Sequence, residues 1–407
     1  MKYKDARVTV MGLGRFGGGL GVTRWLLDQG AKVLLTDLAS EEELSNQLST
    51  LGSHGNLQCV FGEHREEDFV NADIVVANPA VQMPWDNIYL QAAWREGVQV
   101  TTEIELLTSQ LNRKNVIGVT GSSGKSTTAS MIHVGLQSAG LPCLLGGNIG
   151  GSLLNQLSSM PPETIVVLEL SSAMLWWLNK NGSWSPSVAV LTTIEPNHID
   201  WHGSFEAYKS CKELLTVHQV EGDISITQDL EASFEGLLLL GKHNERNAAV
   251  AFLAAIAVGA DAKYVRKGIQ EFRGLPHRLQ FVCDGFYNDS KSTTPTATKL
   301  AVDAFDDPQK VHLIVGGYDK KVDLDLLARQ SERVACMYAI GATASGIVEQ
   351  SHGEVRKFET LEEAVSDAMQ QMKEGEILLL SPGCASWDQF TNYEARGNLF
   401  CNLVTAG

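Results

Sequence analysis

The most restrictive feature of the sequence is a glycine-rich turn that joins an apolar stretch to a helical one. It reads Gly118-Val-Thr-Gly-Ser-Ser-Gly-Lys-Ser-Thr-Thr128. Such a turn presents backbone N–H groups at a helix N-terminus, where they bind an anion, and Lys125 adds a positive charge. Ser126 is placed to ligand a Mg²⁺ ion that bridges phosphates. Because the glycines depart from the common G-x-x-x-x-G-K-[ST] spacing, the sequence predicts a variant nucleotide-binding loop in an α/β fold.

Short apolar runs alternate with helical stretches along the whole chain, which predicts parallel sheets because parallel neighbours need crossover connections. The 407 residues suggest about three domains at ~150 residues each. We expect an N-terminal Rossmann-like domain (1–107), a central domain with a parallel sheet like that of P-loop ATPases (108–274) and a C-terminal Rossmann-like domain (275–407). The expected strands are 8–11, 32–36, 74–77, 98–101, 116–120, 164–170, 188–194, 311–315, 337–340 and 377–380.

Charge and cysteine content exclude several classes of function. The formal net charge is −16, which works against binding to nucleic acid or to an anionic membrane surface. No segment approaches the ~20 uninterrupted apolar residues of a membrane span, and the N-terminus has no signal-peptide pattern. Seven scattered cysteines without a C-x-x-C pair favour reduced thiols. We therefore expect a cytoplasmic protein that is not inserted in a membrane.

A second glycine-rich turn, Gly12-Leu-Gly-Arg-Phe-Gly17, follows the first expected strand, and Asp37 ends the next. This arrangement is typical of a dinucleotide fold in which the acidic residue accepts a hydrogen bond from a ribose hydroxyl. The pattern alone is weak, so an NAD(P)-dependent oxidoreductase remains one interpretation. The downstream phosphate loop argues against it, because hydride transfer needs no second phosphate site.

Three further side chains near the phosphate loop could carry chemistry. Glu169 ends an apolar strand and could complete a Mg²⁺ site with Ser126, and His198 follows the next strand. Lys212 lies in a helical stretch and, by pattern alone, would be an ordinary solvent-exposed lysine. Cys384 has no histidine partner that the sequence could identify, so we interpret it as a packed cysteine rather than a nucleophile.

These motifs occur together in an order that resembles the Mur ligases, ATP-dependent amide-forming enzymes of peptidoglycan precursor synthesis. The resemblance covers nearly the whole chain. Its most specific part is C-terminal, where two stretches are similar to the branch that adds D-glutamate. The residues that carry it are the phosphate loop, Glu169-Leu-Ser-Ser172, Asn197-His-Ile-Asp-Trp-His202, Lys212, His243-Asn244 with Asn247, Pro276-His-Arg278, Asn288-Asp-Ser-Lys-Ser-Thr293 and Ser381-Pro-Gly-Cys-Ala-Ser-Trp-Asp-Gln-Phe390.

The resemblance implies a two-step reaction. ATP phosphorylates the carboxylate of UDP-N-acetylmuramoyl-L-alanine, and the amine of glutamate then attacks the acyl phosphate. The resemblance also implies two Mg²⁺ ions, which screen the converging negative charges, and a monomeric protein. Lys212 matches a lysine that is carbamylated in the family. Carbamylation would turn the side chain into a metal-bridging carboxylate, so the resemblance reverses the interpretation of Lys212 as an exposed lysine.

The family's functional residues carry over to this chain as follows. The residues matched to catalysis are Lys125, Glu169, His198 and Lys212, and those matched to metal binding are Ser126, Glu169, His198 and Lys212. ATP is matched to Gly121, Ser122, Ser123, Gly124, Lys125, Ser126, Thr127, Asn244, Asn247, Arg278 and Asp289. The UDP substrate is matched to Gly12, Gly14, Arg15, Phe16, Gly17, Asp37, Asn78, Asn148 and Ser171. Glutamate is matched to Lys291, Thr293, Lys320, Ser386 and Tyr393.

The chain departs from the family pattern at a few positions. Leu38-Ala39 replaces the Thr-Arg of some members, Asn78-Pro79-Ala80 replaces Ser-Pro-Gly, and Ser123 replaces Asn. The stretch between Lys212 and His243 is short, which predicts a trimmed central sheet. Alternatives to D-glutamate addition are the same chemistry with L-glutamate or another amino acid, a folylpolyglutamate synthetase, an NAD(P)-dependent oxidoreductase and a catalytically silent binding protein.

Overall fold

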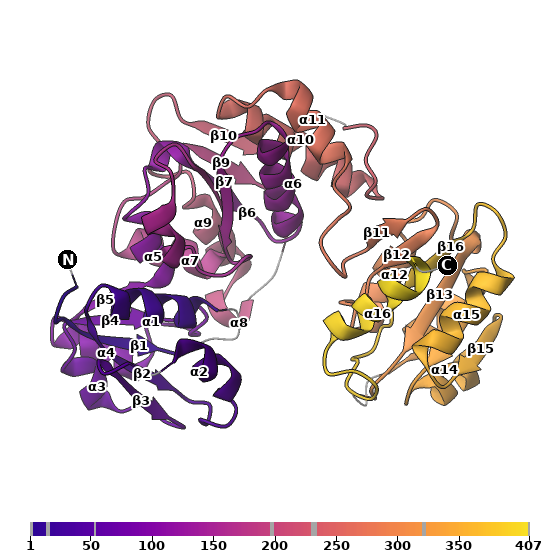
Figure 1. The fold of residues 1–407 in the computed structure, drawn as a ribbon, viewed down its shortest axis with the longest axis horizontal. Coiled ribbons are helices and arrows are strands. Elements are labelled where there is room, and N and C mark those ends of the chain that lie inside the picture. The colour runs from indigo at the N-terminus through magenta and orange to yellow at the C-terminus, as the bar shows by residue number, and fades with distance from the viewer. Residues whose placement is uncertain are drawn as a thin grey trace. The chain divides into compact units, whose positions relative to one another are not determined.

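The computed structural model describes residues 3–13, 17–52, 54–195, 199–228, 234–319 and 323–405 (Figure 1). The chain forms two compact units, one made of Met1–Ser233 with Arg246–Ile269 and the other of Phe234–Glu245 with Gln270–Gly407. The first unit contains two five-stranded sheets and the second a six-stranded sheet. The predicted three-domain α/β architecture is confirmed. Within the described part of the chain, no helix is both long and apolar enough to cross a bilayer.

The N-terminal sheet has the strand order β3-β2-β1-β4-β5, and all neighbours are parallel. Val8 and Val10 of β1 pack toward α1 and α5, whereas Val75 and Ala77 of β4 pack toward α3 and α4. Helices thus cover both faces, as an all-parallel sheet requires. The elements are β1 (Arg7–Met11), α1 (Gly18–Asp28), β2 (Lys32–Asp37), α2 (Ser45–Leu51), β3 (Leu57–Phe61), α3 (Glu66–Val70), β4 (Ile74–Ala77), α4 (Ile88–Arg95), β5 (Gln99–Thr102) and α5 (Glu103–Thr108).

The central sheet is also fully parallel, in the order β10-β9-β6-β8-β7. Its middle strands, β6 and β8, are buried along their whole length, which explains their continuous apolar sequences. The elements are η1 (Arg113–Asn115), β6 (Val116–Thr120), α6 (Lys125–Ser138), β7 (Cys143–Gly147), η2 (Leu154–Ser159), β8 (Ile165–Glu169), α7 (Ser172–Lys180), β9 (Val188–Leu191), α8 (Ile199–His202), α9 (Phe205–Glu213), β10 (Ile224–Thr227), α10 (Lys242–Ala257) and α11 (Ala262–Gln270).

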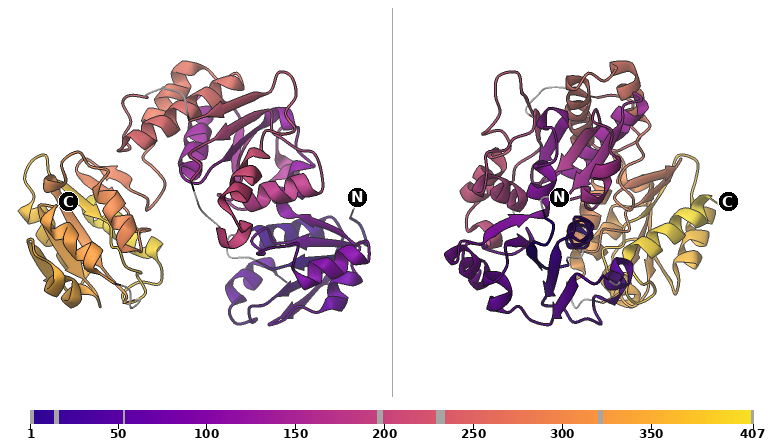
Figure 2. Two further views of the ribbon diagram at one scale, coloured as in Figure 1. Left: turned by 180° about the vertical axis from the view of Figure 1, so that it is seen from behind. Right: turned by 60° about the vertical axis from the view of Figure 1, so that its left-hand side comes forward.

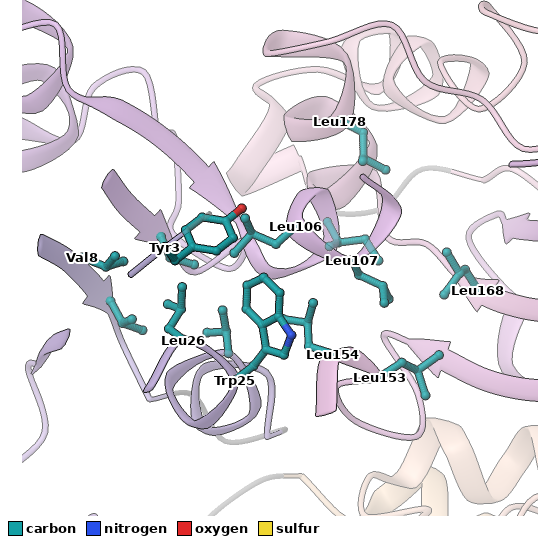
Figure 3. Packing of buried hydrophobic residues seen from close by; sticks show 14 of the residues in the cluster. Tyr3, Val8, Trp25, Leu26, Leu106, Leu107, Leu153, Leu154, Leu168 and Leu178 are labelled. Carbon is teal, nitrogen blue, oxygen red and sulfur yellow. The ribbon is translucent and has the colours of Figure 1, made fainter. Parts of the chain in front are cut away.

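One hydrophobic core joins these two sheets into a single unit. Figure 3 shows Tyr3 and Trp25 of the N-terminal domain beside Leu106, and Leu153 and Leu154 on the central-domain side of the same cluster. The Tyr3 and Trp25 rings meet edge to face with centroids 5.2 Å apart. Burial of these side chains fixes the N-terminal domain against the central one, so a ligand can be bound by both.

The C-terminal sheet has the order β11-β12-β16-β13-β14-β15, and only the β11–β12 pair is antiparallel. Alternate residues of β13 face opposite ways: Leu313 packs toward α12–α14 and Ile314 toward α15 and α16. Figures 1 and 2 show the ribbon of this sheet and the helices around it. The elements are β11 (Gln280–Cys283), β12 (Phe286–Asn288), α12 (Pro295–Val302), η3 (Pro308–Lys310), β13 (Val311–Gly316), α13 (Asp325–Ala328), η4 (Arg329–Glu332), β14 (Cys336–Ile340), α14 (Ala344–Gln350), β15 (Val355–Phe358), α15 (Leu361–Gln371), β16 (Ile377–Leu380) and α16 (Tyr393–Thr405).

Candidate nucleotide, substrate and amino-acid sites

The predicted phosphate loop lies between β6 and α6, at the carboxyl edge of the central sheet. Gly121 and Gly124 both have positive φ, and a Cβ on Gly121 would lie 1.8 Å from the Thr192 hydroxyl. Only glycine fits this conformation without strain. Ser126 and Thr127 form the first turn of α6 and are half-buried, while Ser123 is exposed. The loop therefore directs backbone N–H groups and the helix N-terminus toward the same edge.

Hydrogen bonds from neighbouring strands hold the loop in this shape. Ser122 N donates to Thr193 O at 2.7 Å, and the Lys125 ammonium donates to Ser122 O at 2.9 Å. The Ser122 hydroxyl donates to Glu195 O at 2.8 Å and lies 2.9 Å from the Tyr208 hydroxyl. These hydrogen bonds hold the loop in its conformation before a ligand binds, so less conformational entropy is lost on binding.

Glu169, the last residue of β8, is 1% exposed. Its Oε1 accepts a hydrogen bond from Asn148 Nδ2 at 3.0 Å, and its Oε2 has no hydrogen-bond partner among the described residues. A buried carboxylate oxygen without a partner is costly unless a cation or donor compensates it. The structure thus places two predicted residues, Asn148 and Glu169, in direct contact and leaves one carboxylate oxygen for a cation.

Lys212 on α9 is 1% exposed, so the interpretation of this residue as a solvent-exposed lysine was wrong. The helical pattern could not reveal this, because the burial comes from the central sheet: Lys212 Nζ lies 3.4 Å from the Thr120 hydroxyl of β6. Burial, with a contribution from the charge of Lys125, lowers the pKa of Lys212 to about 7. Lys212 also lies 4.8 Å from the centroid of the Tyr208 ring.

A large cavity lies in the first unit, lined by the N-terminal and the central domain. It encloses about 780 Å³. Five residues predicted to bind the UDP substrate line it: Gly12, Asp37, Asn78, Asn148 and Ser171. The cavity reaches Asn148, which binds Glu169, so it extends to the vicinity of the phosphate loop. A ligand that fills it can therefore present one end to a nucleotide bound at that loop.

The glycine turn after β1 is fixed by Asp37. Asp37 Oδ2 accepts from Leu13 N at 2.8 Å and its Oδ1 accepts from Ala39 N at 2.9 Å. Gly17 has φ of +83° and caps α1. Each Asp37 oxygen keeps a further lone pair, so the carboxylate can shape the turn and still accept from a ligand.

The two asparagines matched to ATP, Asn244 and Asn247, lie on α10 in different surroundings. Asn247 Oδ1 accepts from Gln228 Nε2 at 2.6 Å and would lie 2.5 Å from a Cβ at Gly124, so it packs against the phosphate loop. Asn244 is buried, and its Nδ2 donates to Leu240 O at 2.8 Å. Asn247 belongs to the first unit and Asn244 to the second.

In the second unit, Asp289 follows β12 and is buried. Its Oδ1 accepts from Leu279 N at 3.0 Å and its Oδ2 from the Ser381 hydroxyl at 2.7 Å. Burial raises the pKa of Asp289 to about 6. Arg278 is exposed next to this group, and its charge opposes the rise.

The described residues matched to glutamate lie in the second unit, on the loops that follow β12 and β16 and at the start of α16. Lys291 Nζ lies 5.2 Å from the centroid of the Tyr393 ring, and burial raises the pKa of Tyr393 to about 12. Ser386 is buried, whereas Thr293 is half-buried. Arg396 ties the loops together, because its guanidinium donates to Ser290 O at 2.9 Å and to Cys384 O at 3.1 Å. Cys384 is buried beside Thr343, which supports its interpretation as a packed cysteine.

Five predicted residues lie outside the described part of the chain: Gly14, Arg15, Phe16, His198 and Lys320. Within the described residues, no group of three or more His, Cys, Asp and Glu side chains gathers as a metal site. The sequence analysis also missed contributors to the candidate site. Tyr208 stands four residues before Lys212 and so shares its helix face. Glu103 lines the cavity and directly follows β5. The sequence positions of both residues could have indicated their roles. Arg396 had no local signal.

Three family models match the chain in succession. Residues 6–102 match the Mur ligase MurD-like N-terminal domain, 119–236 the Mur ligase middle domain and 277–384 the Mur ligase glutamate ligase domain. The UDP-N-acetylmuramoylalanine–D-glutamate ligase of Koribacter versatilis is 34% identical, with 99% of this chain and 98% of that protein aligned. The chain belongs to the Mur ligase family. The ligase of the same name from Roseiflexus sp. is 35% identical, with 99% of each chain aligned.

Solved structures of other Mur ligases share the fold at lower identity. UDP-N-acetylmuramate-alanine ligase MurC from Thermotoga maritima superposes with a TM-score of 0.57 at 18% identity, covering 98% of this chain and 99% of the other. A UDP-N-acetylmuramoyl-L-alanyl-D-glutamate–2,6-diaminopimelate ligase gives a TM-score of 0.53 at 16% identity, covering 94% and 87%. These likenesses support the three-domain arrangement of this Mur ligase.

Proposed function

We propose that this Mur ligase is an ATP-dependent amide ligase that joins D-glutamate to UDP-N-acetylmuramoyl-L-alanine, a step of peptidoglycan precursor synthesis. Relatives that carry this name align with the chain over almost its full length. The structural observation that carries the proposal is the cavity that runs from the Gly12 turn to Asn148, the residue that binds Glu169 beside the phosphate loop. An NAD(P)-dependent oxidoreductase does not need a substrate cavity that extends to an ATP phosphate loop.

The reaction follows from the chemistry of a carboxylate, which is a poor electrophile until it gains a leaving group. A carboxylate oxygen of the alanyl group attacks the γ-phosphorus of ATP, the bond from that phosphorus to the bridging oxygen breaks, and ADP leaves. The amine of glutamate then attacks the acyl carbon, the bond to the phosphate oxygen breaks, and the amine loses a proton. Lys125 and the N–H groups of the loop stabilise charge on the transferred phosphoryl group.

Divalent cation binding fits the residues at the carboxyl edge of the central sheet. The buried Glu169 Oε2 has no hydrogen-bond partner among the described residues and is a ligand of the type that Mg²⁺ prefers. Ser126 lies in the first turn of α6 at the same edge of the sheet. We assign one ion to Ser126 and Glu169, and a second to His198 and Lys212. When bound, Mg²⁺ neutralises charge on the phosphates and on the substrate carboxylate.

Mg²⁺ prefers oxygen ligands, so Lys212 suits such a site as a carbamate, and burial of the amine favours the formation of a carbamate. A pKa of about 7 leaves much of the amine neutral at neutral pH. Neutral Nζ adds to the carbon of CO₂, an N–C bond forms, and one proton leaves to solvent, which gives a carbamate of charge −1. The charge of Glu169 acts on Lys212, and Thr120 lies within 3.4 Å of its Nζ, so the carbamate would lie near the proposed metal site.

The amino acid is assigned to the second unit. Lys291 supplies a positive charge for a glutamate carboxylate, next to Tyr393. Lys320, Thr293 and Ser386 complete the proposed set of glutamate-binding residues.

We place the domain boundaries at residues 107 and 274, which fall between the stretches matched by the three family models.

The proposal is tested by measuring ADP and phosphate release with ATP, Mg²⁺, UDP-N-acetylmuramoyl-L-alanine and either enantiomer of glutamate. We expect release only when all components are present, with D-glutamate and not L-glutamate as the acceptor. The Lys125→Ala variant should release neither product. Release with L-glutamate alone would reassign the substrate, and binding of NADH without binding of UDP-sugar would overturn the proposal.

A further inference from the structure

His64 lines the cavity of the first unit with a fixed orientation, and neither the sequence motifs nor the comparisons assign it a role. It follows β3 and is half-buried. Its ring meets the rings of Phe69 on α3 and Tyr89 on α4 edge to face, with centroids 5.7 Å and 5.4 Å apart (Figure 1 shows these helices). Two aromatic contacts of this kind restrict rotation of the imidazole.

The hydrogen bonds of Thr36 define which nitrogen of His64 carries the proton. The Thr36 hydroxyl lies 3.0 Å from Glu63 O and 2.8 Å from His64 Nδ1. A carbonyl oxygen can only accept, so the single hydroxyl proton goes to Glu63 O, and the hydroxyl oxygen accepts from Nδ1–H. In the neutral ring Nε2 is then an acceptor. No described residue provides it with a hydrogen-bond partner.

The ring is neutral under ordinary conditions. Burial lowers the pKa of His64 below its usual value, although the charges of Asp37 on β2 and Asp68 on α3 oppose this. His64 lines the cavity, and its Nε2 therefore carries a lone pair rather than a proton.

The position of His64 along the cavity assigns it to one end of the substrate. The reacting carboxylate must lie near Asn148, which binds Glu169 beside the phosphate loop. The base is at the opposite end of a UDP-linked substrate. His64 lies beside the end of β2, because its Nδ1 is 2.8 Å from the Thr36 hydroxyl. Asp37, Leu38 and His64 all line the cavity, so we assign the base to these residues. Leu38-Ala39 replaces a Thr-Arg pair of other members and leaves this part with fewer polar side chains for a base.

We propose, on the basis of the function proposed above, that His64 is a specificity-determining residue whose Nε2 accepts the N3–H of uracil. Cytosine has a lone pair at N3, so the same contact would set two acceptors against each other. A polar group that is left unpaired in such a site costs about 1–3 kcal/mol, or roughly 5- to 150-fold in affinity. Because the Nδ1–H···Thr36 hydrogen bond keeps Nε2 an acceptor, the fold itself provides the discrimination between uracil and cytosine.

The test is the binding of UDP and CDP, measured by calorimetry, to the full chain and to His64→Phe. Phenylalanine keeps a ring against Phe69 and Tyr89 but has no acceptor. The unaltered protein should prefer UDP by at least about fivefold, and His64→Phe should lose most of that preference through weaker UDP binding. The matched control is His54→Phe, because His54 is an exposed histidine of the same domain; it should keep the preference.

Two further measurements separate base reading from a structural role. Thr36→Val removes the acceptor for Nδ1–H and should reduce the UDP preference while His64 is retained. As pH falls through the range in which His64 protonates, UDP binding should weaken more for the unaltered protein than for His64→Phe, because protonated Nε2 can no longer accept. An unchanged UDP/CDP ratio in His64→Phe would overturn the inference. Active ligation together with that unchanged ratio would leave the proposed function intact.

Discussion

Two buried ionisable side chains of this Mur ligase have pKa values far from those of exposed groups. Lys212 in the first unit has a pKa near 7, and Asp289 in the second has one near 6, and burial is the main cause in both. Burial disfavours the charged form, whatever its sign. The charged form of each residue is therefore held at a cost in folding free energy.

Replacing Lys212 with alanine should reduce turnover by roughly 10²-fold or more, the scale of losing one charge-stabilising group in the transition state. If the lysine acts as a carbamate, acetate or formate should partly restore activity by occupying the space of the missing carboxylate. ADP release measured with and without these acids gives the answer. Lys209→Ala is the matched control, since Lys209 lies on the same helix but is exposed and paired with Glu213; it should retain full activity. Activity near that of the unaltered protein in Lys212→Ala would remove the carbamate from the mechanism.

Asp289→Asn should stabilise the second unit while it impairs ATP turnover. The pKa of Asp289 is about 6 in the fold against 3.8 for the unperturbed group, so the ionised form is disfavoured by roughly 3 kcal/mol at pH 8. Because the raised pKa belongs to an acid, this penalty is absent below pH 3.8 and grows as pH rises toward 6. The gain from asparagine should therefore be largest at pH 8 and about half as large at pH 5. Urea unfolding at the two pH values measures it.

Asp303→Asn should change the stability of the same unit in the opposite direction. Burial raises the pKa of Asp303, but hydrogen bonds from Lys299 and Arg333 more than reverse this, so the pKa lies below its usual range. Asparagine at this position should lower stability at pH 8 by no more than about 1 kcal/mol, since the pairs are partly exposed. If Asp289→Asn also lowered stability at pH 8, the carboxylate would be better solvated than its burial indicates.

At the scale of elements, the position of a strand in its sheet decides whether the sequence predicts that strand. All ten predicted strands are present, and most of them are buried runs of Val, Ile and Leu in the middle of a sheet. The six strands that the sequence analysis missed are β3, β7, β10, β11, β12 and β15, and all but β12 lie at a sheet edge. Edge strands are half-exposed and mix polar with apolar residues, as in Ile224-Ser-Ile-Thr227 of β10. Such a pattern gives a weaker signal than a buried apolar run, although the sequence analysis did predict one edge strand, β5.

The same reasoning explains which parts of the candidate site the sequence could show. The phosphate loop is contiguous, so its glycines, Lys125 and Ser126 were visible in one stretch. Contacts between distant segments were not: Tyr208 meets Ser122 across 86 residues, and Arg396 meets Ser290 across 106. Only the fold brings such side chains together, and no local pattern marks them.

The β6–loop–α6 element predicts a clear outcome for Gly121→Ala. The new Cβ would lie 1.8 Å from the Thr192 hydroxyl, in a backbone conformation with φ of +149°. The loop must shift, and strain of order 1–3 kcal/mol corresponds to about 5- to 150-fold weaker ATP binding. Equilibrium binding of a fluorescent ATP analogue measures the change.

Gly140→Ala is its matched control, because Gly140 follows the other end of α6 with φ of +74° and a Cβ added there would meet open space. This variant should lose some stability through backbone strain but bind ATP normally. Equal loss of ATP binding in the two variants would mean that strain in general, and not the shape of the phosphate loop, controls the affinity.

At the scale of the whole molecule, the hydrophobic clusters define what unfolds together. The cluster with Tyr3, Trp25 and Leu154 spans the N-terminal and central domains. The clusters on the two faces of the C-terminal sheet are made of residues of the second unit. Elements that share a core lose it cooperatively, whereas separate cores can melt separately. Three Mur ligase domains should therefore unfold as two cooperative units.

Tryptophan fluorescence and circular dichroism should resolve these two steps. Seven of the eight tryptophans lie in the first unit, and Trp387 alone lies in the second, so Trp387→Phe makes the fluorescence specific for the first. Leu154→Ala and Leu379→Ala are a matched pair in the two cores, each expected to cost about 2–5 kcal/mol. In urea titrations followed by both signals, Leu154→Ala should lower the midpoint of the fluorescence transition, which reports the first unit. Leu379→Ala should lower the midpoint of the second transition, which circular dichroism alone reports. If both variants shifted one shared transition, a core common to all three domains would have to hold the protein together.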